Sequence, residues 1–360
     1  MILKLVRKMF FPIWMSGALI CFAAAATESP ASAPASSHGS APKQARVLFV
    51  EDSAATREFK PQPEIVRAMV NRGILQFTGK TNLALAWRTV VSTQDVVGLK
   101  VFSTPGADSG TRPSVVAAVI EGLLAAGLPP KKIIIWDKQM NHLRDAGFVD
   151  LAKRYKVRVA ASASAGYDEK VFYESSIIGN LVWGDLEFGK DKGKNKDPKL
   201  GRKSFVTKVV TREITRIISL APLLNHYESG VSGHLCSVAL GSVENTVRFE
   251  ARADRLATAV PDIFNLPELG DRVVLNITDA LIGQYQGEQS SLFQYATAVN
   301  QLWFSKDPVA LDVVAVHELE RERVAAKIAS DKINLELYEN ASLIELGVSD
   351  LKKIKIEVTK

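Results

Sequence analysis

DVVGLKVF, residues 95–102, is the first of three consecutive segments that together indicate the fold. The other two are TRPSVVAAVIEGLLAAG (111–127) and KKIIIWD (131–137). The first and third segments are β-branched apolar runs of strand length, and the middle one carries apolar residues at helical spacing. Pro113 stands in the first turn of this predicted helix, and Gly127 stands where it ends. A strand, a helix and a strand in this order predict two parallel strands joined by a crossover helix.

The same alternation extends in both directions along the chain. Before it, RVLFVE at 46–51 is strand-like and PEIVRAMVNRGILQFTG at 63–79 is helical. After it, strands are predicted at 205–210, 215–224, 273–281 and 301–306, and helices at 307–327 and 335–348. The sequence therefore predicts an α/β fold, with a mixed, largely parallel sheet and helices on both faces, in a single domain over residues 45–350.

The segment before this domain carries targeting features. A basic start and an apolar stretch ending in small residues predict a secretory signal peptide at 1–26. Residues 27–44, rich in Ser, Ala and Pro, are predicted to form a disordered linker. We therefore expect a periplasmic or secreted protein with no stable membrane span after signal cleavage, and an uncleaved anchor is the alternative. Only Cys236 remains after cleavage, so the core and not an internal disulfide must stabilise the domain.

The basic charge of the chain is unevenly distributed. Removal of 1–26 takes away Lys4, Arg7 and Lys8 and lowers the formal net charge from +6 to +3. In the remainder, GKDKGKNKDPKLGRK at 189–203 holds seven basic and two acidic residues and is predicted to be a basic insertion. A solvated segment is its ordinary interpretation, and an anion-binding lid is the alternative. This pattern does not indicate a nucleic-acid partner.

Two residues are candidates for catalysis. His226 follows a predicted strand, and ligands of α/β folds bind at the carboxyl ends of strands. Lys100 stands in an otherwise apolar strand, where a buried lysine is costly unless it is paired or faces a ligand. A structural histidine and an edge-exposed lysine are the alternatives.

Further residues are predicted to bind a small anionic ligand in the same pocket. Gly230 and Gly233 permit close backbone approach, and Ser232 is a candidate cap for a helix that begins near His234. Free N–H groups at that helix start would suit an anion. The full set is Thr111, Arg112, Asp137, Gly230, Ser232, Gly233, His234, Glu244, Asn245 and Asp279. Helix capping and polar helix ends are the structural alternatives for these side chains.

Cys236 and Asp279 carry two narrower hypotheses. A helix start and nearby histidines lower a thiol pKa, so Cys236 is a candidate nucleophile, with a small buried apolar residue as the alternative. His226, His234 and Asp279 are candidate ligands of a metal that the sequence does not identify. One cysteine after cleavage cannot form a four-cysteine iron–sulfur cluster. No dinucleotide fingerprint, P-loop or zincin motif occurs.

Five segments in order resemble the domain-of-unknown-function family 362: VVGLKVF, TRPSVVAAVIEGLLAAGLPPKKIIIWD, PLLNHYESGVSGHLCSVALGSVENTVRF, NITDALIGQYQG and DPVALDVVA. The resemblance spans most of residues 46–320 and implies no settled activity. Family members are often exported or fused to ferredoxin-type iron–sulfur modules, and this sequence contains no such module. Phe102 replaces the family's usual asparagine, and Cys236 and Ser237 replace its usual lysine and asparagine.

These observations predict an exported α/β protein with a strand-end pocket for a small anionic ligand. Whether the protein is an enzyme stays open, because acid–base chemistry would require His226 or Lys100 to have a perturbed pKa inside a closed cleft. The alternatives are a non-catalytic binding protein and a partner protein of a redox complex.

Overall fold

The computed structural model describes residues 44–189, 199–328 and 333–360. The predicted signal peptide, the linker up to residue 43 and residues 190–198 of the basic insertion lie outside the described residues. Among the described residues, no helix is both long and apolar enough to cross a membrane.

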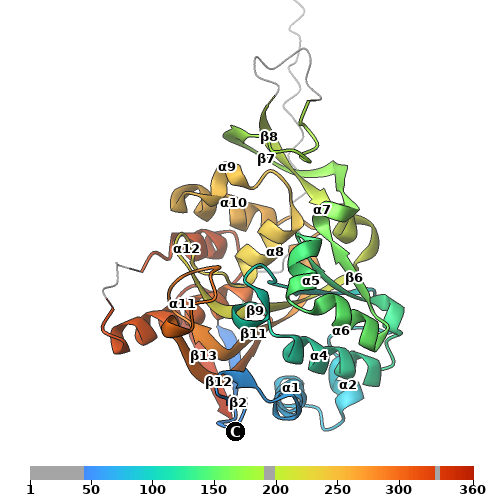
Figure 1. Cartoon of the computed structure of the whole chain (residues 1–360), viewed down its shortest axis with the longest axis vertical. Helices are drawn as coiled ribbons and strands as arrows, with labels where there is room; N and C mark the ends of the chain where they lie inside the picture. The colour runs from blue at the N-terminus through green and yellow to red at the C-terminus, as the bar shows by residue number, and fades with distance from the viewer. Residues whose placement is uncertain (1–43, 190–198, 329–332) are drawn as a thin grey trace, which may run out of the picture. The chain divides into compact units, whose positions relative to one another are not determined.

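One large mixed sheet forms the centre of the fold (Figure 1). Its strands run in the order β13-β1-β12-β11-β9-β4-β5-β6, and β10 pairs with β9. Strand β12 is antiparallel to β1 and β11, and the other neighbours in this order are parallel. The predicted mixed, largely parallel sheet is therefore confirmed. The strands are β1 (Ala45–Glu51), β4 (Val97–Val101), β5 (Ile133–Asp137), β6 (Arg158–Ala161), β9 (Arg216–His226), β10 (Gly230–Val231), β11 (Val273–Gln284), β12 (Ala296–Ser305) and β13 (Ile354–Thr359).

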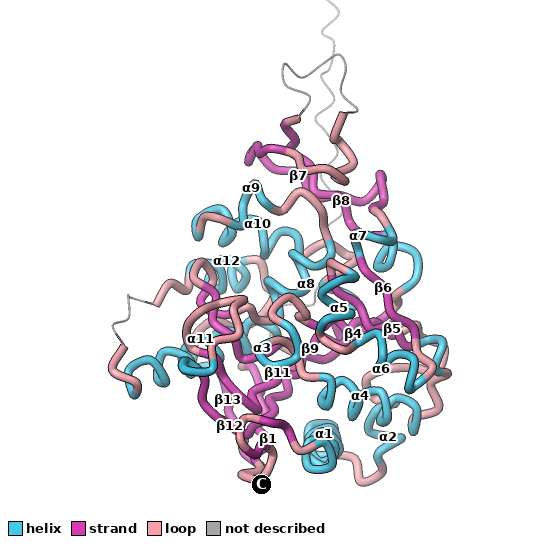
Figure 2. The backbone as a smooth tube through the Cα atoms, viewed as in Figure 1, coloured by secondary structure: helices cyan, strands magenta, loops and turns pink. Residues whose placement is uncertain are grey.

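Helices cover both faces of this sheet, as predicted, and Figure 2 shows them as two separate groups. One apolar core lies under α1 (Pro63–Thr78), α2 (Leu83–Arg88), α4 (Pro113–Ala125), α5 (Met140–Asp145) and α6 (Phe148–Tyr155). A second core lies under α8 (His234–Ser242), α10 (Ala253–Phe264), α11 (Pro308–Ala325) and α12 (Glu336–Leu343). Short helices and turns complete the connections: α3 (Gly106–Ser109), α7 (Ser162–Ala165), α9 (Val247–Glu250), η1 (Pro130–Lys132), η3 (Gly270–Arg272), η4 (Phe293–Tyr295) and η5 (Leu351–Lys353).

The predicted strand–helix–strand unit is present as β4, α4 and β5. Alternate residues of a strand point to opposite faces of a sheet. Leu99 and Val101 belong to the core under α4, so Lys100 between them points to the opposite face, where α8 lies. In the parallel register, Lys100 lies beside Trp136 of β5 and Ser219 of β9. Burial of this lysine is therefore a consequence of its central strand.

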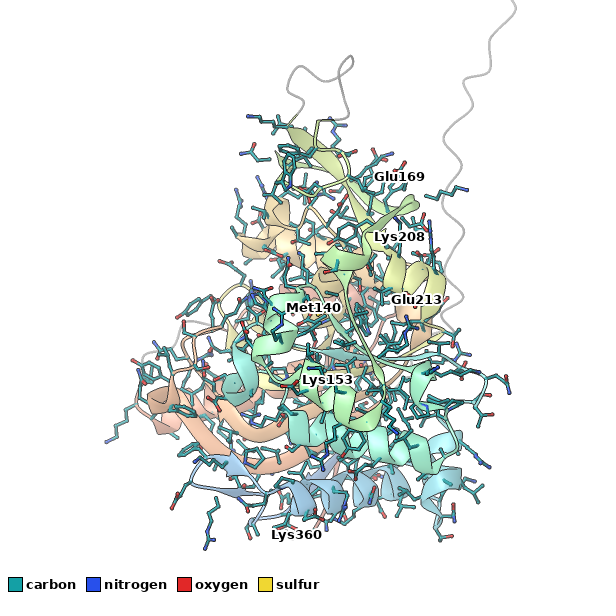
Figure 3. The ribbon with its side chains drawn as sticks, turned by 45° about the vertical axis from the view of Figure 1, so that its right-hand side comes forward. Met140, Lys153, Glu169, Lys208, Glu213 and Lys360 are labelled. Atoms are coloured by element: carbon teal, nitrogen blue, oxygen red, sulfur yellow. The ribbon has the colours of Figure 1, made fainter. Side chains whose placement is uncertain are left out.

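A separate antiparallel pair consists of β7 (Tyr167–Asn180) and β8 (Leu200–Thr207). Glu169 and Lys208, both labelled in Figure 3, lie at the end of the pair where β7 begins and β8 has just ended. The prediction of one strand over 205–210 is partly wrong, because η2 (Val209–Glu213) follows β8 as a π-helical turn. A second small hairpin pairs β2 (Thr56–Arg57) with β3 (Lys60–Pro61).

The sheet extends beyond the predicted domain end at residue 350. Strand β13 pairs in parallel with β1, from Ala45 opposite Ile354 to Val50 opposite Thr359. Its alternating charged and apolar residues give a strand pattern that a pair of neighbouring lysines obscures. The last helix, α12, lies within the range predicted for it.

Candidate functional site

A buried ion pair lies at the carboxyl ends of β4 and β5. The Nζ atom of Lys100 is 2.8 Å from Oδ1 of Asp137, and Lys100 is fully buried. The same Nζ donates to the backbone oxygen of Val101 at 2.6 Å and to Oγ of Ser237 on α8 at 3.0 Å. Three acceptors use all three protons of an ammonium group, so Lys100 is held as a cation.

Asp137 is held as an anion by the donors around it. Ser103 donates its backbone N–H and its hydroxyl to Oδ2, at 2.8 Å and 2.7 Å, and the Lys138 N–H donates to Oδ1 at 2.8 Å. Burial opposes ionisation of Asp137, but the charge and hydrogen bond of Lys100 and the bonds from Ser103 outweigh it and lower the carboxyl pKa. Burial also lowers the pKa of Lys100, and the Asp137 charge counteracts this effect in part.

Gly241 makes the approach of α8 to this pair possible. A Cβ atom at position 241 would lie 2.3 Å from Cε and 2.8 Å from Nζ of Lys100. The helix therefore carries a glycine in its last turn, where any side chain would displace the lysine. In the sequence, the signal for this contact was a glycine within a predicted helix.

A cavity of about 480 Å³ opens above the ion pair, between the ends of β4, β5 and β9 and helix α8. Its buried floor consists of Lys100, Asp137, Ser232 and Ser237. Three partly exposed acids, Glu228, Glu250 and Glu288, also line it, and we call them the rim carboxylates. A volume of this size suits a small organic ligand.

Two hydroxyl groups at the floor can form further hydrogen bonds. Ser237 accepts a hydrogen bond from Lys100, which leaves its own hydroxyl hydrogen for another acceptor. Oγ of Ser232 is buried and has no hydrogen-bond partner among the described residues. Buried polar atoms normally have a partner, so the Ser232 hydroxyl and the hydroxyl hydrogen of Ser237 are both available to a group that enters the cavity.

His226 ends β9 and lines the same cavity. Its Nδ1 accepts the backbone N–H groups of Glu228 and Ser229, each at 3.3 Å, so the ring proton is on Nε2. Burial lowers the pKa of His226, and the charges of Glu288, Glu250 and Glu228 oppose this shift. The imidazole is therefore neutral at pH 7. Four of the residues selected from the sequence, His226, Lys100, Asp137 and Ser232, thus line one cavity.

The predicted anion site at the start of α8 is already occupied by a side chain of the protein. Asp312 on α11 accepts the N–H groups of His234 and Leu235 at 2.7 Å and 2.9 Å. A Cβ atom on Gly233 would lie 2.6 Å from this carboxylate, and Gly230 similarly faces Val316. The prediction that Ser232 caps the helix and that Gly230 and Gly233 bind the ligand is therefore corrected, because Asp312 fills that position.

His234 is a structural residue. Its Nδ1 is 2.8 Å from Oγ of Ser219 and its Nε2 is 3.0 Å from Oγ1 of Thr278. Burial lowers the pKa of His234 to about 3, so the ring stays neutral. Its two hydroxyl partners on adjacent strands β9 and β11 satisfy both ring nitrogens, which removes it from the predicted ligand and metal sets.

Thr111, Arg112 and Asp279 are also used within the fold. The Thr111 hydroxyl donates to the backbone oxygen of Leu220. Arg112 donates its backbone N–H and its Nη1 to the two oxygens of Asp279, both at 2.9 Å, and both side chains are buried. The predicted ligand contacts of these three residues are therefore corrected: they attach the start of α4 to β9 and β11.

Glu244 and Asn245 support the segment next to β7. The Glu244 carboxylate accepts the N–H of Leu186 with both oxygens at 2.9 Å. Asn245 donates its own N–H to Asp185 and its Nδ2 to the oxygen of Lys203. Neither residue lines the cavity. The prediction that they bind the ligand is corrected, because their side chains form hydrogen bonds with the backbone of Leu186 and Lys203 instead.

Cys236 lines the cavity but is not an activated thiol. Burial raises its pKa to about 12. A thiol with such a pKa is protonated at neutral pH, so the nucleophile hypothesis is corrected. Within the described ranges, no group of three or more His, Cys, Asp or Glu side chains is placed to hold a metal ion.

Six residues at or beside the cavity were not predicted from the sequence: Ser103, Lys138, Ser237 and the three rim carboxylates. Lys138 directly follows a strand end and donates to Thr246 Oγ1 at 2.5 Å. Its position directly after the predicted strand KKIIIWD could have identified it as a candidate site residue. The rim carboxylates come from two loops and the end of α9, so no local pattern marked them.

Comparison with known proteins identifies a family and a distant structural relative. A family model described as "Domain of unknown function (DUF362)" matches residues 97–317, more than half of the chain. A crystal structure of a protein from Thermotoga maritima aligns at 11% identity with a TM-score of 0.40, covering 76% of this chain and 61% of that chain. The comparison with curated proteins gives no match.

Proposed function

The chain belongs to the family described as Domain of unknown function (DUF362), and from this premise we propose that its cavity binds a small organic ligand by a carboxylate or similar anionic oxygen group at the floor. One observation carries the proposal. The hydroxyl groups of Ser237 and Ser232 line one cavity with free hydrogen-bonding capacity, and Ser237 is polarised by the Lys100 ammonium group.

The donors at the floor favour an anionic group there. Lys100 and Asp137 balance each other in charge, and both oxygens of Asp137 already accept hydrogen bonds, so the Ser237 hydroxyl is left as a donor that Lys100 polarises. An anionic oxygen that accepts from Ser237 would lie one hydrogen bond away from the lysine charge. Hydrogen bonds that involve ions are about twice as strong as neutral ones.

We propose binding because Lys100 and Cys236 are not available as a base and a nucleophile. Lys100 donates hydrogen bonds with all three of its N–H groups and, as an ammonium cation, has no free lone pair, so it cannot act as a base in this state. The Cys236 thiol is protonated. Lys100 instead orients and polarises Ser237.

A titration with isocaproate, a branched carboxylate without an amino group, tests this proposal. Isothermal calorimetry on the purified chain should show saturable binding that Ser237→Ala weakens by about tenfold, the value of one charge-assisted hydrogen bond. Ser176→Ala is the control, because Ser176 is exposed on β7 and does not line the cavity. Absence of saturable binding, or equal binding by Ser237→Ala, would remove the proposal.

We also propose that the protein is exported, on the strength of the basic and apolar pattern of residues 1–26. Intact-mass measurement of protein from fractionated cells is the test. A mature form that begins near residue 27 outside the cytoplasm is expected. An uncut chain in the cytoplasm would contradict export.

A further inference from the structure

Few cations lie near the three rim carboxylates among the described residues. Glu228 makes no ion pair or hydrogen bond through its carboxylate to any described residue. Glu288 accepts the Tyr227 N–H at 2.6 Å and has no cation within ion-pair distance among the described residues. Glu250 has one cation, Lys138, at 3.8 Å, which is longer than a hydrogen bond.

These three charges lie close enough to His226 to act on it. Each lines the cavity, and each acts on the His226 ring electrostatically. Because His226 is neutral, it does not compensate them. Like charges that share a partly desolvated space repel one another, and an incoming cation relieves that repulsion.

The floor has the opposite polarity, because it presents hydrogen-bond donors. Asp137 is already bonded to Lys100, the Ser237 hydroxyl is free to donate, and the buried, unpartnered Ser232 hydroxyl lies in the same cavity as an independent sign of a ligand. Apolar lining is added to this cavity by Phe102, Leu240 and Val247. A complementary ligand therefore needs an anionic end, a cationic end and a short apolar part.

From this polarity we infer that the ligand is a small zwitterion of the amino-acid type, with its carboxylate at the Ser237 floor and its ammonium group among Glu228, Glu250 and Glu288. This inference rests on the proposed binding function and adds the cationic end of the ligand. It makes Glu228 a specificity-determining residue, since its carboxylate is the one without a partner among the described residues.

Three matched compounds test the inference on the purified chain by isothermal calorimetry: L-leucine, isocaproate, which lacks the amino group, and isoamylamine, which lacks the carboxylate. We expect L-leucine to bind at least about tenfold more tightly than either, because loss of the ion pair with the rim carboxylates, or of the charge-assisted hydrogen bond from Ser237, removes at least about a factor of ten. Glu228→Gln should reduce leucine affinity by about tenfold and leave isocaproate affinity unchanged. Glu339→Gln, an exposed acid on α12, is the control and should change neither.

The outcomes separate this inference from the binding function on which it rests. If isocaproate binds as tightly as L-leucine, or if Glu228→Gln weakens both equally, the ammonium site is wrong and the anion-binding floor stands. If isoamylamine equals L-leucine, the carboxylate contributes nothing and both statements are wrong. If neither carboxylate compound binds, both statements are again overturned. A folded Glu228→Gln protein, shown by an unchanged melting temperature, is required for each comparison.

Discussion

Lys100 Nζ and Asp137 Oδ1 lie 2.8 Å apart at the ends of adjacent parallel strands, with the lysine fully buried and the carboxylate almost so. Taking two charges out of water costs several kcal/mol each unless hydrogen bonds compensate it. Here Val101, Ser237, Ser103 and Lys138 provide those bonds. The pair is therefore stable only as a complete set, beneath a cavity that it polarises.

Removal of the lysine should destabilise the fold. Lys100→Met leaves the Asp137 carboxylate buried without its cation, and we expect the free energy of unfolding to fall by about 3–5 kcal/mol. Lys153→Met is a matched control, because Lys153, labelled in Figure 3, makes an exposed 3.0 Å pair with Asp150. That variant should lose under about 1 kcal/mol. Urea unfolding followed by circular dichroism measures both; equal losses would contradict a special role for the buried pair.

Asp312 should make stability depend on pH. Burial raises its pKa to about 7, despite the two N–H groups that it accepts at the start of α8. The folded state therefore holds this proton more tightly than the unfolded state. Its contribution is fully present below the unfolded pKa, near 3.8, and is lost as the pH rises through about 7.

Asp312→Asn isolates this effect, because asparagine cannot titrate there. Across that pH range, wild-type stability should fall by about 4 kcal/mol relative to the variant, at about 1.4 kcal/mol per unit of pKa shift. Urea unfolding at steps from about pH 4 to about pH 8 measures the difference. Parallel pH profiles for the two proteins would show that Asp312 has an ordinary pKa.

Gly233 should tolerate substitution less well than a glycine of similar backbone geometry. Its φ is +40°, and a Cβ atom would lie 2.6 Å from the Asp312 carboxylate. Gly166 has a similar backbone, with φ +75° and ψ −177° against φ +40° and ψ −174° at Gly233. A Cβ atom there would meet only the Lys208 side chain, 3.5 Å from Nζ, so Gly166 carries the backbone cost alone. We expect Gly166→Ala to cost about 1–3 kcal/mol and Gly233→Ala at least about twice that. Thermal unfolding of both variants is the measurement, and equal shifts would argue against the Asp312 contact.

Cys236 should react slowly in the native protein. Burial keeps its thiol protonated, with the pKa raised to about 12. Iodoacetamide at about pH 8 should label Cys236 at under about one-hundredth of the rate seen in urea, because the thiolate is the reacting form. Peptide mass spectrometry distinguishes it from Cys21. Rapid native labelling would revive the nucleophile hypothesis.

The strand and helix patterns of the sequence predicted most of the central fold. The runs that became β1, β4, β5, β9, β11 and β12 are apolar and β-branched, and those properties act within a few residues. The π-helical turn after Thr207 was missed, because FVTKVV continues a strand pattern where the chain changes direction. Strand β13 was missed because its charges hide a short apolar alternation.

The candidate site was predicted only in part. His226 and Asp137 were selected at predicted strand ends, Lys100 as a charge within an apolar strand, and Ser232 from the glycine-containing loop before a predicted helix, and all four line the cavity. Asp279 at a strand end, and His234 and Arg112 at predicted helix starts, were equally good candidates, yet their partners are Ser219, Thr278 and each other. Local sequence identifies a polar strand end, but it does not show whether the polar group meets a cavity or another strand.

The α/β class, the strand–helix–strand unit and the polar strand ends follow from the sequence alone, because hydrophobic periodicity is a local property. Which of those polar ends faces a cavity depends on the packing of distant segments. The sheet order places β9 between β4 and β11, and α11 brings Asp312 to the start of α8 from 78 residues away along the chain. Such partners depend on long-range packing, because a buried charge forms hydrogen bonds with the donors that the fold places beside it.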